Sequence, residues 1–286
     1  MWTIRRSVQR TLARRLSFWA FLCVIGLSAS AHAQLRADSV RQDFRRLVGD
    51  VWSVWTSPAH GTSDDWGAFA AVSALTGAAA RVDEPLAQWI TDHPNSWPVW
   101  TLKHTLSEEA KYPAYELGSG QYLLPISGVL YLAGSIGHSQ ALRDAGLGCA
   151  TAHLTSAGAR EIVYLLIARD RPRTSPDDAF VIRSPGSHDW NKHSFFSGHI
   201  ANSLGCASFL SHRFDLHAAT PVVYAVPIVI GAGRIMDGRH WLSDTVVGAM
   251  FGYATGTAIA ARMRERESRA TRAVKSPVVV SFSVPF

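Results

Sequence analysis

The feature that most constrains this chain is a set of long stretches without Asp, Glu, Lys or Arg. They cover residues 117–142, 193–212, 216–233 and 245–261, and they are 26, 20, 18 and 17 residues long. Stretches of this length and composition belong in lipid or in a protein core. Ser, Thr, Gly and His dilute all four, so hydropathy leaves both alternatives open. The sequence predicts an all-α fold, a helical bundle of about five or six core helices that is membrane-embedded or membrane-associated.

Composition removes several classes of protein. With 47% hydrophobic and 17% charged residues, the 286-residue chain is neither a disordered protein nor a coiled coil. The net charge of +6 does not indicate nucleic-acid binding, because five arginines and no acidic residue lie within residues 1–33. When those five are set aside, 23 basic residues face 22 acidic ones. No nucleic-acid partner is therefore predicted, and protein partners are not identified.

Residues 1–33 have the pattern of a cleaved export signal. A basic start precedes an apolar run at 16–27, and Ala31, His32 and Ala33 provide a small-x-small cleavage site. The alternative is an uncleaved first membrane span. We expect an exported protein, either periplasmic or in the inner membrane with a periplasm-facing active site.

The remaining chain is expected to form three parts. Residues 34–64 are an amphipathic segment, with Phe44, Leu47, Val51 and Trp55 suited to a surface or interfacial helix. Residues 65–262 form the helical domain, and residues 263–286 form a basic tail with a short C-terminal strand. The tail fits the cytoplasmic side of a membrane or a solvated helix end. Six tryptophans between residues 50 and 100 suit either a membrane-interface belt or core packing.

The cysteines give no sign of a metal centre. No CxxC pair or Cys/His ligand spacing occurs, which argues against structural zinc and thioredoxin chemistry. Export would place Cys149 and Cys206 in an oxidising compartment where a bridge is allowed. Both lie in apolar runs, and we expect them to be buried free thiols.

Three segments place polar residues within or beside apolar runs, which is costly unless the residues are used or solvated. The first runs from Tyr164 to Arg171 and Pro172, the second is Ser197-Gly198-His199, and the third runs from Arg234 through His240 to Asp244. A helix beginning at Ser-Gly exposes backbone N–H groups to an anion. His240 and Asp244 are four residues apart, so on one helix the carboxylate would share a face with the imidazole and fix its tautomer. Taken singly, these are ordinary helix ends, caps and surface pairs.

Together, Arg-Pro, Ser-Gly-His and Arg-x5-His-x3-Asp closely resemble the three-part signature of the type 2 phosphatidic acid phosphatase and vanadium haloperoxidase superfamily. The signature covers residues 164–244. The resemblance implies a phosphomonoesterase without metal or other cofactor, in which His240 attacks phosphorus, Asp244 orients it, and His199 protonates the leaving group. It implies further that the phosphoryl oxygens are held by Arg171, Ser197, Gly198 and Arg234.

The chain departs from that pattern at three positions. Tyr164 stands where the family has a phosphate-binding Lys, two helical turns before Arg171, and offers a neutral hydroxyl in place of a cation. Lys192 is the preferred substitute from sequence, and Arg169 and Arg173 are further candidates. Phe196 replaces the usual Pro before Ser-Gly-His, and Gly233 replaces the common Ser before Arg234, and both changes are expected to be tolerated.

The predicted function is a phosphatase acting on a lipid phosphate, a diphosphate or a small phosphomonoester, with the membrane as its other partner. Two alternatives remain. Vanadate could replace the phosphoryl group and give a haloperoxidase. Alternatively, the missing Lys could leave a catalytically silent protein that binds a lipid phosphate.

Overall fold

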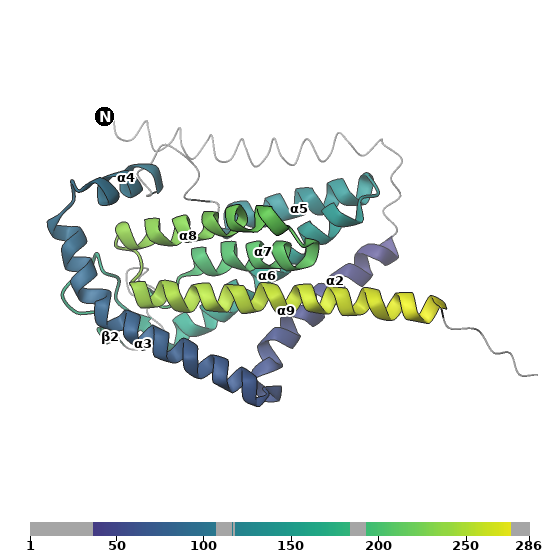
Figure 1. Ribbon diagram of the computed structural model, residues 1–286, viewed down its shortest axis with the longest axis horizontal. Coiled ribbons are helices and arrows are strands. Elements are labelled where there is room, and N and C mark those ends of the chain that lie inside the picture. The colour runs from purple at the N-terminus through teal and green to yellow at the C-terminus, as the bar shows by residue number, and fades with distance from the viewer. Residues whose placement is uncertain (1–36, 107–115, 117, 184–192, 276–286) are drawn as a thin grey trace, which may run out of the picture. The chain divides into compact units, whose positions relative to one another are not determined.

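The computed structural model describes residues 37–106, 116, 118–183 and 193–275. The predicted signal peptide, Lys192 and the predicted C-terminal strand lie outside these residues. The chain divides into two compact units, Met1–Val40 and Arg41–Phe286. Among the described residues, the first unit contributes only the first turn of one helix, and the second unit contains the helical bundle (Figure 1).

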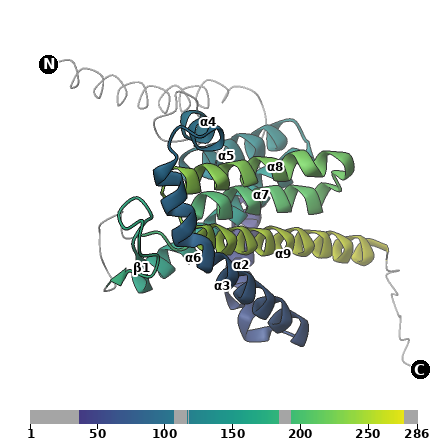
Figure 2. The ribbon, with the colours of Figure 1, turned by 60° about the vertical axis from the view of Figure 1, so that its left-hand side comes forward.

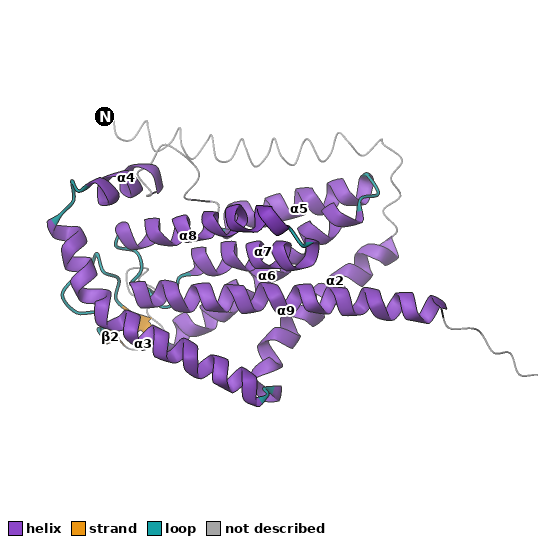
Figure 3. Cartoon of the chain, viewed as in Figure 1, coloured by secondary structure: helices purple, strands orange, loops and turns teal. Residues whose placement is uncertain are grey.

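Eight α-helices make up most of the described chain, which confirms the all-α prediction (Figure 3). They are α2 (Ala37–Thr56), α3 (Ser63–Asp92), α4 (Trp97–Leu106), α5 (Gly120–Ile136), α6 (Gln140–Leu166), α7 (Gly198–Phe214), α8 (Thr220–Met236) and α9 (Leu242–Lys275). Two 3-10 turns, η1 (Ser57–His60) and η4 (His217–Ala219), precede α3 and α8. Strands β1 (Ala168–Arg169) and β2 (Ile182–Arg183) pair antiparallel, with Ala168 opposite Arg183.

Helices α6, α7 and α9 form the centre of the bundle, and α7 runs beside α9 in both ribbon views (Figures 1 and 2). Cys149, Phe209 and Ile259, one from each helix, lie in the same buried apolar cluster. Glycines spaced four residues apart on α9 allow the close approach of α7. A methyl group added at Gly248 would lie 2.5 Å from the Ser197 carbonyl oxygen, and one added at Gly252 would lie 3.0 Å from the Cα of Ala201.

The expectation of free thiols is wrong, because Cys149 and Cys206 form a disulfide between α6 and α7. Their Cα atoms are 4.4 Å apart. The tight packing of the two helices explains the pairing, since it brings the buried Cys149 and the partly buried Cys206 within bonding distance. Two apolar runs considered separately gave no indication of this contact.

Helix α2 packs against the bundle through buried acidic residues as well as through Val54, which contacts the central apolar cluster. Asp50 is 1% exposed and pairs with Arg262 and Arg266 of α9 at 2.8 and 2.6 Å. The apolar side chains Phe44 and Trp52 are exposed on the same helix. Helix α9 continues to Lys275, beyond residue 262, where the helical domain is predicted to end. The predicted domain boundaries remain predictions.

The six tryptophans between residues 50 and 100 are all exposed, so the core-packing alternative is wrong. They are Trp52, Trp55, Trp66, Trp89, Trp97 and Trp100. Of the charge-free stretches, one lies in a described helix that is long and apolar enough to cross a bilayer, His217–Met236. Only 28% of its most apolar window is buried. This finding concerns length and composition alone, which core helices of soluble proteins can share.

Candidate active site

The sequence-predicted site residues come together at one end of the bundle, on the left in Figure 1, where α3 packs against α9. Helices α6 and α8 end here, and α7 and α9 begin here. Arg171 follows β1, Arg234 lies in the last turn of α8, and His240 lies in the turn before α9. All three are buried. Lys192 cannot be placed, because it lies outside the described residues.

The hydrogen bond of His240 defines its tautomer. Its Nδ1 lies 2.7 Å from the backbone carbonyl oxygen of Ser194. A carbonyl oxygen only accepts, so Nδ1 of the neutral ring carries the proton and Nε2 holds the lone pair. The expected bond from His240 to Asp244 is replaced by this contact, since the nearest carboxylate oxygen is 3.9 Å from Nδ1. The two residues do not share a helical face, because α9 begins only at Leu242.

Asp244 instead organises the start of α9. Its Oδ2 accepts hydrogen bonds from the Trp241 backbone N–H at 2.9 Å and from the Ser194 hydroxyl at 2.5 Å. The first contact is half of a capping box, in which an acidic residue in the first turn binds back to the N-cap N–H. Because Ser194 also provides the carbonyl that holds His240, Asp244 fixes the imidazole through Ser194.

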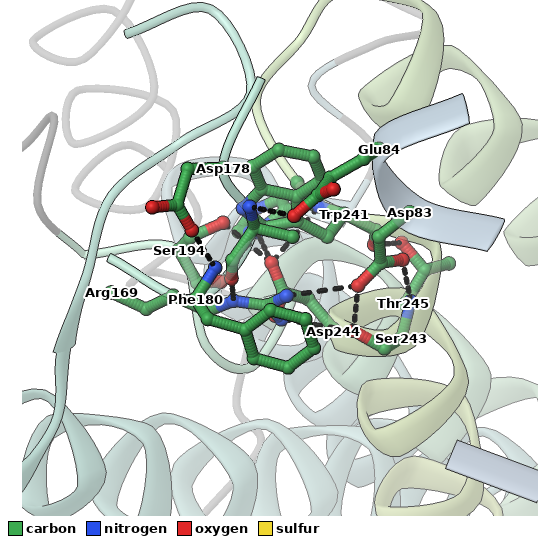
Figure 4. Close-up of polar contacts among 12 residues, drawn as sticks. Asp83, Glu84, Arg169, Asp178, Phe180, Ser194, Trp241, Ser243, Asp244 and Thr245 are labelled. Atoms are coloured by element: carbon green, nitrogen blue, oxygen red, sulfur yellow. Dashed lines mark hydrogen bonds and ion pairs between the residues drawn. The ribbon is translucent and has the colours of Figure 1, made fainter. Parts of the chain in front are cut away.

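Arg169 binds Asp244 from the other side (Figure 4). Its guanidinium also donates to Asp83 of α3 at 2.8 Å, to the Ser243 hydroxyl at 2.9 Å and to the Ala179 carbonyl at 2.8 Å. Arg169 is therefore committed to a buried protein network, and the expectation that it could replace the missing Lys as a phosphate ligand is not supported. Asp83 lies far outside the three-part signature and had no distinguishing signal in the sequence.

The start of α7 offers hydrogen-bond donors to the site. Ser197 is the N-cap residue and Gly198 the first helical residue. The first N–H groups of a helix have no partner within the helix and carry its positive dipole end. The Ser197 hydroxyl is completely buried and has no hydrogen-bond partner among the described residues. Buried hydroxyls are normally hydrogen-bonded, so this one is consistent with a bound polar group.

Both histidines of the site favour the neutral form. Burial and the nearby guanidinium groups of Arg234, Arg160 and Arg171 lower the pKa of His199 well below its usual value. Burial, together with Arg171 and Arg234, does the same to the pKa of His240. Positive charge accumulates around two uncharged imidazoles, and such a site attracts an anion.

Tyr164 lies in the last turn of α6, and the expected two helical turns between Tyr164 and Arg171 do not form because α6 ends at Leu166. Tyr164 is buried, and its ring centroid is 4.9 Å from that of His193. The guanidinium of Arg160 lies over the Tyr164 ring, 5.4 Å from its centroid. Sequence reasoning missed Arg160, although its place one helical turn before Tyr164 is visible in the sequence. No group of three or more His, Cys, Asp or Glu side chains that could hold a metal ion occurs in the described part of the chain.

The fold and the site thus define an all-α protein in which buried arginines surround two imidazoles, and the Nε2 atom of His240 holds a lone pair. The model of the PAP2 superfamily matches residues 145–268. These residues include the whole three-part signature at 164–244, so the match agrees with the resemblance derived from the three motifs.

Two relatives illustrate the similarity. A lipid A 4'-phosphatase from Porphyromonas gingivalis is 29% identical over 89 residues, which cover 31% of this chain and 38% of that protein. A solved transmembrane PAP2-type phosphatidylglycerolphosphate phosphatase from Bacillus subtilis shares 18% sequence identity, with a TM-score of 0.45. That match covers 70% of this chain and 96% of the other.

Proposed function

We propose that the protein is a metal-independent phosphatase that hydrolyses a lipid-linked phosphomonoester or diphosphate through a phosphohistidine intermediate. The observation that carries the proposal is the 2.7 Å contact between His240 Nδ1 and the Ser194 carbonyl. It leaves the Nε2 lone pair available beside Arg171 and Arg234. Phosphoryl transfer requires mainly a positioned nucleophile, charge-stabilising donors and a proton donor for the leaving group.

In the first step, His240 Nε2 attacks phosphorus and the bond to the leaving oxygen breaks. Arg171, Arg234, the Ser197 hydroxyl and the Gly198 N–H stabilise the phosphoryl oxygens. The bound anion offsets the guanidinium charges that lower the pKa of His199, so His199 gains a proton in the complex and donates it to the leaving oxygen. In the second step, His199 removes a proton from water, which attacks phosphorus and releases phosphate from His240.

A lipid substrate is supported by the exposed apolar surface. Helix α8 presents Val222 and Ile228 outward, and the exposed tryptophans extend over α2, α3 and α4. Such side chains fit a membrane interface better than water. The two relatives named above are both described as acting on lipid phosphates. We further propose export, with the site facing the periplasm; the Cys149–Cys206 disulfide supports an oxidising compartment.

The test is phosphate release from p-nitrophenyl phosphate and from phosphatidic acid in detergent, with EDTA present. We expect turnover that is lost in His240→Ala and kept in His60→Ala, which alters an exposed histidine outside the site. Mass spectrometry of the protein quenched at alkaline pH should find one phosphoryl group on His240, because phosphohistidine is labile in acid. Turnover that needs a metal, or that survives His240→Ala, would contradict the mechanism.

Tyr164 motivates a second candidate, a catalytically silent protein that binds a lipid phosphate. The neutral hydroxyl replaces a cation that should stabilise the transition state. Under this alternative neither substrate turns over, even in Tyr164→Lys, while inorganic phosphate still binds. Vanadate-dependent bromide oxidation would identify the haloperoxidase alternative.

A further inference from the structure

Arg160 lies on α6, one helical turn before Tyr164 and on the same face of the helix. Its guanidinium lies over the Tyr164 ring at 5.4 Å from the centroid, a distance at which cation–π attraction holds a guanidinium in place. Tyr164 itself is buried, so this stacking directs the Arg160 side chain inward along the wall of the site.

The other end of that side chain contacts the backbone at the start of α7. A methyl group built on Gly198 would lie 2.5 Å from Arg160 Nη1 and 2.8 Å from its Cδ. Only glycine permits this approach, because any Cβ would displace the guanidinium. The cation therefore lies against the backbone of Gly198, the residue after the N-cap Ser197, whose buried hydroxyl has no partner in the described part of the chain.

The protein does not use all of the hydrogen-bonding capacity of Arg160. Nη2 donates to the exposed carboxylate of Glu161 at 2.5 Å. The Nε N–H is buried and has no hydrogen-bond partner among the described residues. In contrast, the guanidinium of Arg169 donates to four protein groups. Arg160 is thus a cation at the site with donor capacity that a ligand can use.

The charge of Arg160 affects the pKa of two nearby histidines. It contributes to the lowered pKa of His199 on α7 and to that of His153 on α6, whose pKa falls to about 4. Such coupling requires proximity, so it agrees with the contact at Gly198.

We propose that Arg160 binds a phosphoryl oxygen of the substrate and supplies the cation that Tyr164 does not. This inference rests on the proposed phosphatase function. In the proposed arrangement, Tyr164 holds the Arg160 guanidinium by stacking, and Gly198 leaves the space that the guanidinium needs. A charge-assisted contact would then form from α6, one turn away from the position that the family pattern indicates.

The test compares kcat and KM of wild type, Arg160→Ala and Arg160→Lys on p-nitrophenyl phosphate and phosphatidic acid. Arg264→Ala is the matched control. This arginine of α9 is exposed, and its ion pair with the exposed carboxylate of Asp215 is long, at 4.0 Å. We expect kcat/KM to fall on the order of 10²-fold in Arg160→Ala, as for loss of one transition-state donor. Arg160→Lys should retain part of the activity, and Arg264→Ala should match wild type. The double variant Arg160→Ala/Tyr164→Lys should recover activity, a rescue that a purely structural role would not produce.

Binding of inorganic phosphate, measured by isothermal titration, separates the two proposals. If wild type turns over and Arg160→Ala is within about threefold of it in both kcat/KM and phosphate affinity, the role of Arg160 is overturned while the phosphatase function stands. If wild type does not turn over, the phosphatase function fails. Phosphate binding then decides the inference: a tenfold or larger weakening in folded Arg160→Ala supports a phosphate contact, and equal affinity overturns it.

Discussion

At the residue scale, the molecule keeps several imidazoles neutral inside a polar core. His153 lies on α6 against Gly120, and burial, reinforced by the charge of Arg160, lowers its pKa from 6.5 to about 4. The Nδ1 atom has no hydrogen-bond partner among the described residues, and a charged ring there would be poorly stabilised.

This shift predicts a pH dependence of folding. Because the folded state holds the proton of His153 less tightly than the unfolded chain, stability is full above pH 6.5 and declines as the pH falls towards 4. A difference of this size corresponds to roughly 3 kcal/mol. We expect the free energy of unfolding in urea to fall less over this range in His153→Gln than in wild type. His199 and His240 contribute in the same direction, so a residual slope should remain. Superimposable pH profiles for the two proteins would refute the role of His153.

The sequence predicted much of the site at this scale, but not all of it. Arg171, Ser197, Arg234 and His240 were found because their spacing follows a known pattern. The partner of His240 was misassigned because a four-residue spacing implies a shared face only inside a helix, and α9 starts after His240. Arg160 was overlooked because the pattern directed attention to position 164, whereas a long side chain one turn earlier reaches the same place.

At the element scale, the spacing of glycines on α9 determines how close α7 can come. A methyl group on Gly252 would lie 3.0 Å from the Cα of Ala201, which is backbone and cannot rotate away. Gly77 on α3 is a matched control, because a methyl group added there meets nothing within 4 Å.

The two substitutions are expected to change the free energy of unfolding in opposite directions. Gly252→Ala should destabilise the protein by about 1–3 kcal/mol through overpacking. Gly77→Ala should stabilise it by up to about 1 kcal/mol, because alanine favours the helix and finds open space. Urea unfolding of both variants checks this, and a stabilising Gly252→Ala would show that α7 and α9 are not in tight contact at this position.

The buried carboxylate of Asp83 connects α3 to the site, beside the packing of Ala87 against Trp241. Asp83 accepts from Arg169 at 2.8 Å and from the Ser243 backbone N–H at 2.9 Å, so it links α3 to the first turn of α9 (Figure 4). Asp83 and Ser243 are 160 residues apart in the sequence. No local pattern could have predicted this contact, because an aspartate within a helix is usually solvated.

We expect Asp83→Ala to cost about 3–5 kcal/mol of unfolding free energy, because it leaves the buried Arg169 with one carboxylate instead of two. Loss of the Asp83 carboxylate should also lower kcat more than it raises KM. Arg169 would then shift towards Asp244, its remaining partner, and displace the turn that contains His240. Asp92→Ala, at the exposed end of α3, provides the control and should leave both quantities near wild type. Equal stability of the two variants would exclude Asp83 as a structural tie.

At the scale of the whole molecule, the disulfide connects the stability of the bundle to its compartment. It joins α6 to α7 across 57 residues, including both strands and the loop that carries Ser194. Closing a loop of that length in the unfolded chain is worth about 4 kcal/mol in the chain-entropy description. The same bond forms readily only in an oxidising environment, so the proposed export would supply the condition on which this stability depends.

This link predicts the redox state of the protein in cells. When thiols are trapped in intact cells, the full chain should show Cys149 and Cys206 protected from alkylation until reductant is added. A variant lacking residues 1–33 should be retained in the reducing cytoplasm, with both thiols alkylated and, by the same loop-closure argument, a stability lower by about 4 kcal/mol. The Cys149→Ser/Cys206→Ser double variant is the control. It should have the same lowered stability in both compartments, because its stability no longer depends on oxidation. Free thiols in the full chain would contradict both the disulfide and the proposed export. An oxidised pair in both the full chain and the shortened variant would retain the disulfide and remove its support for export.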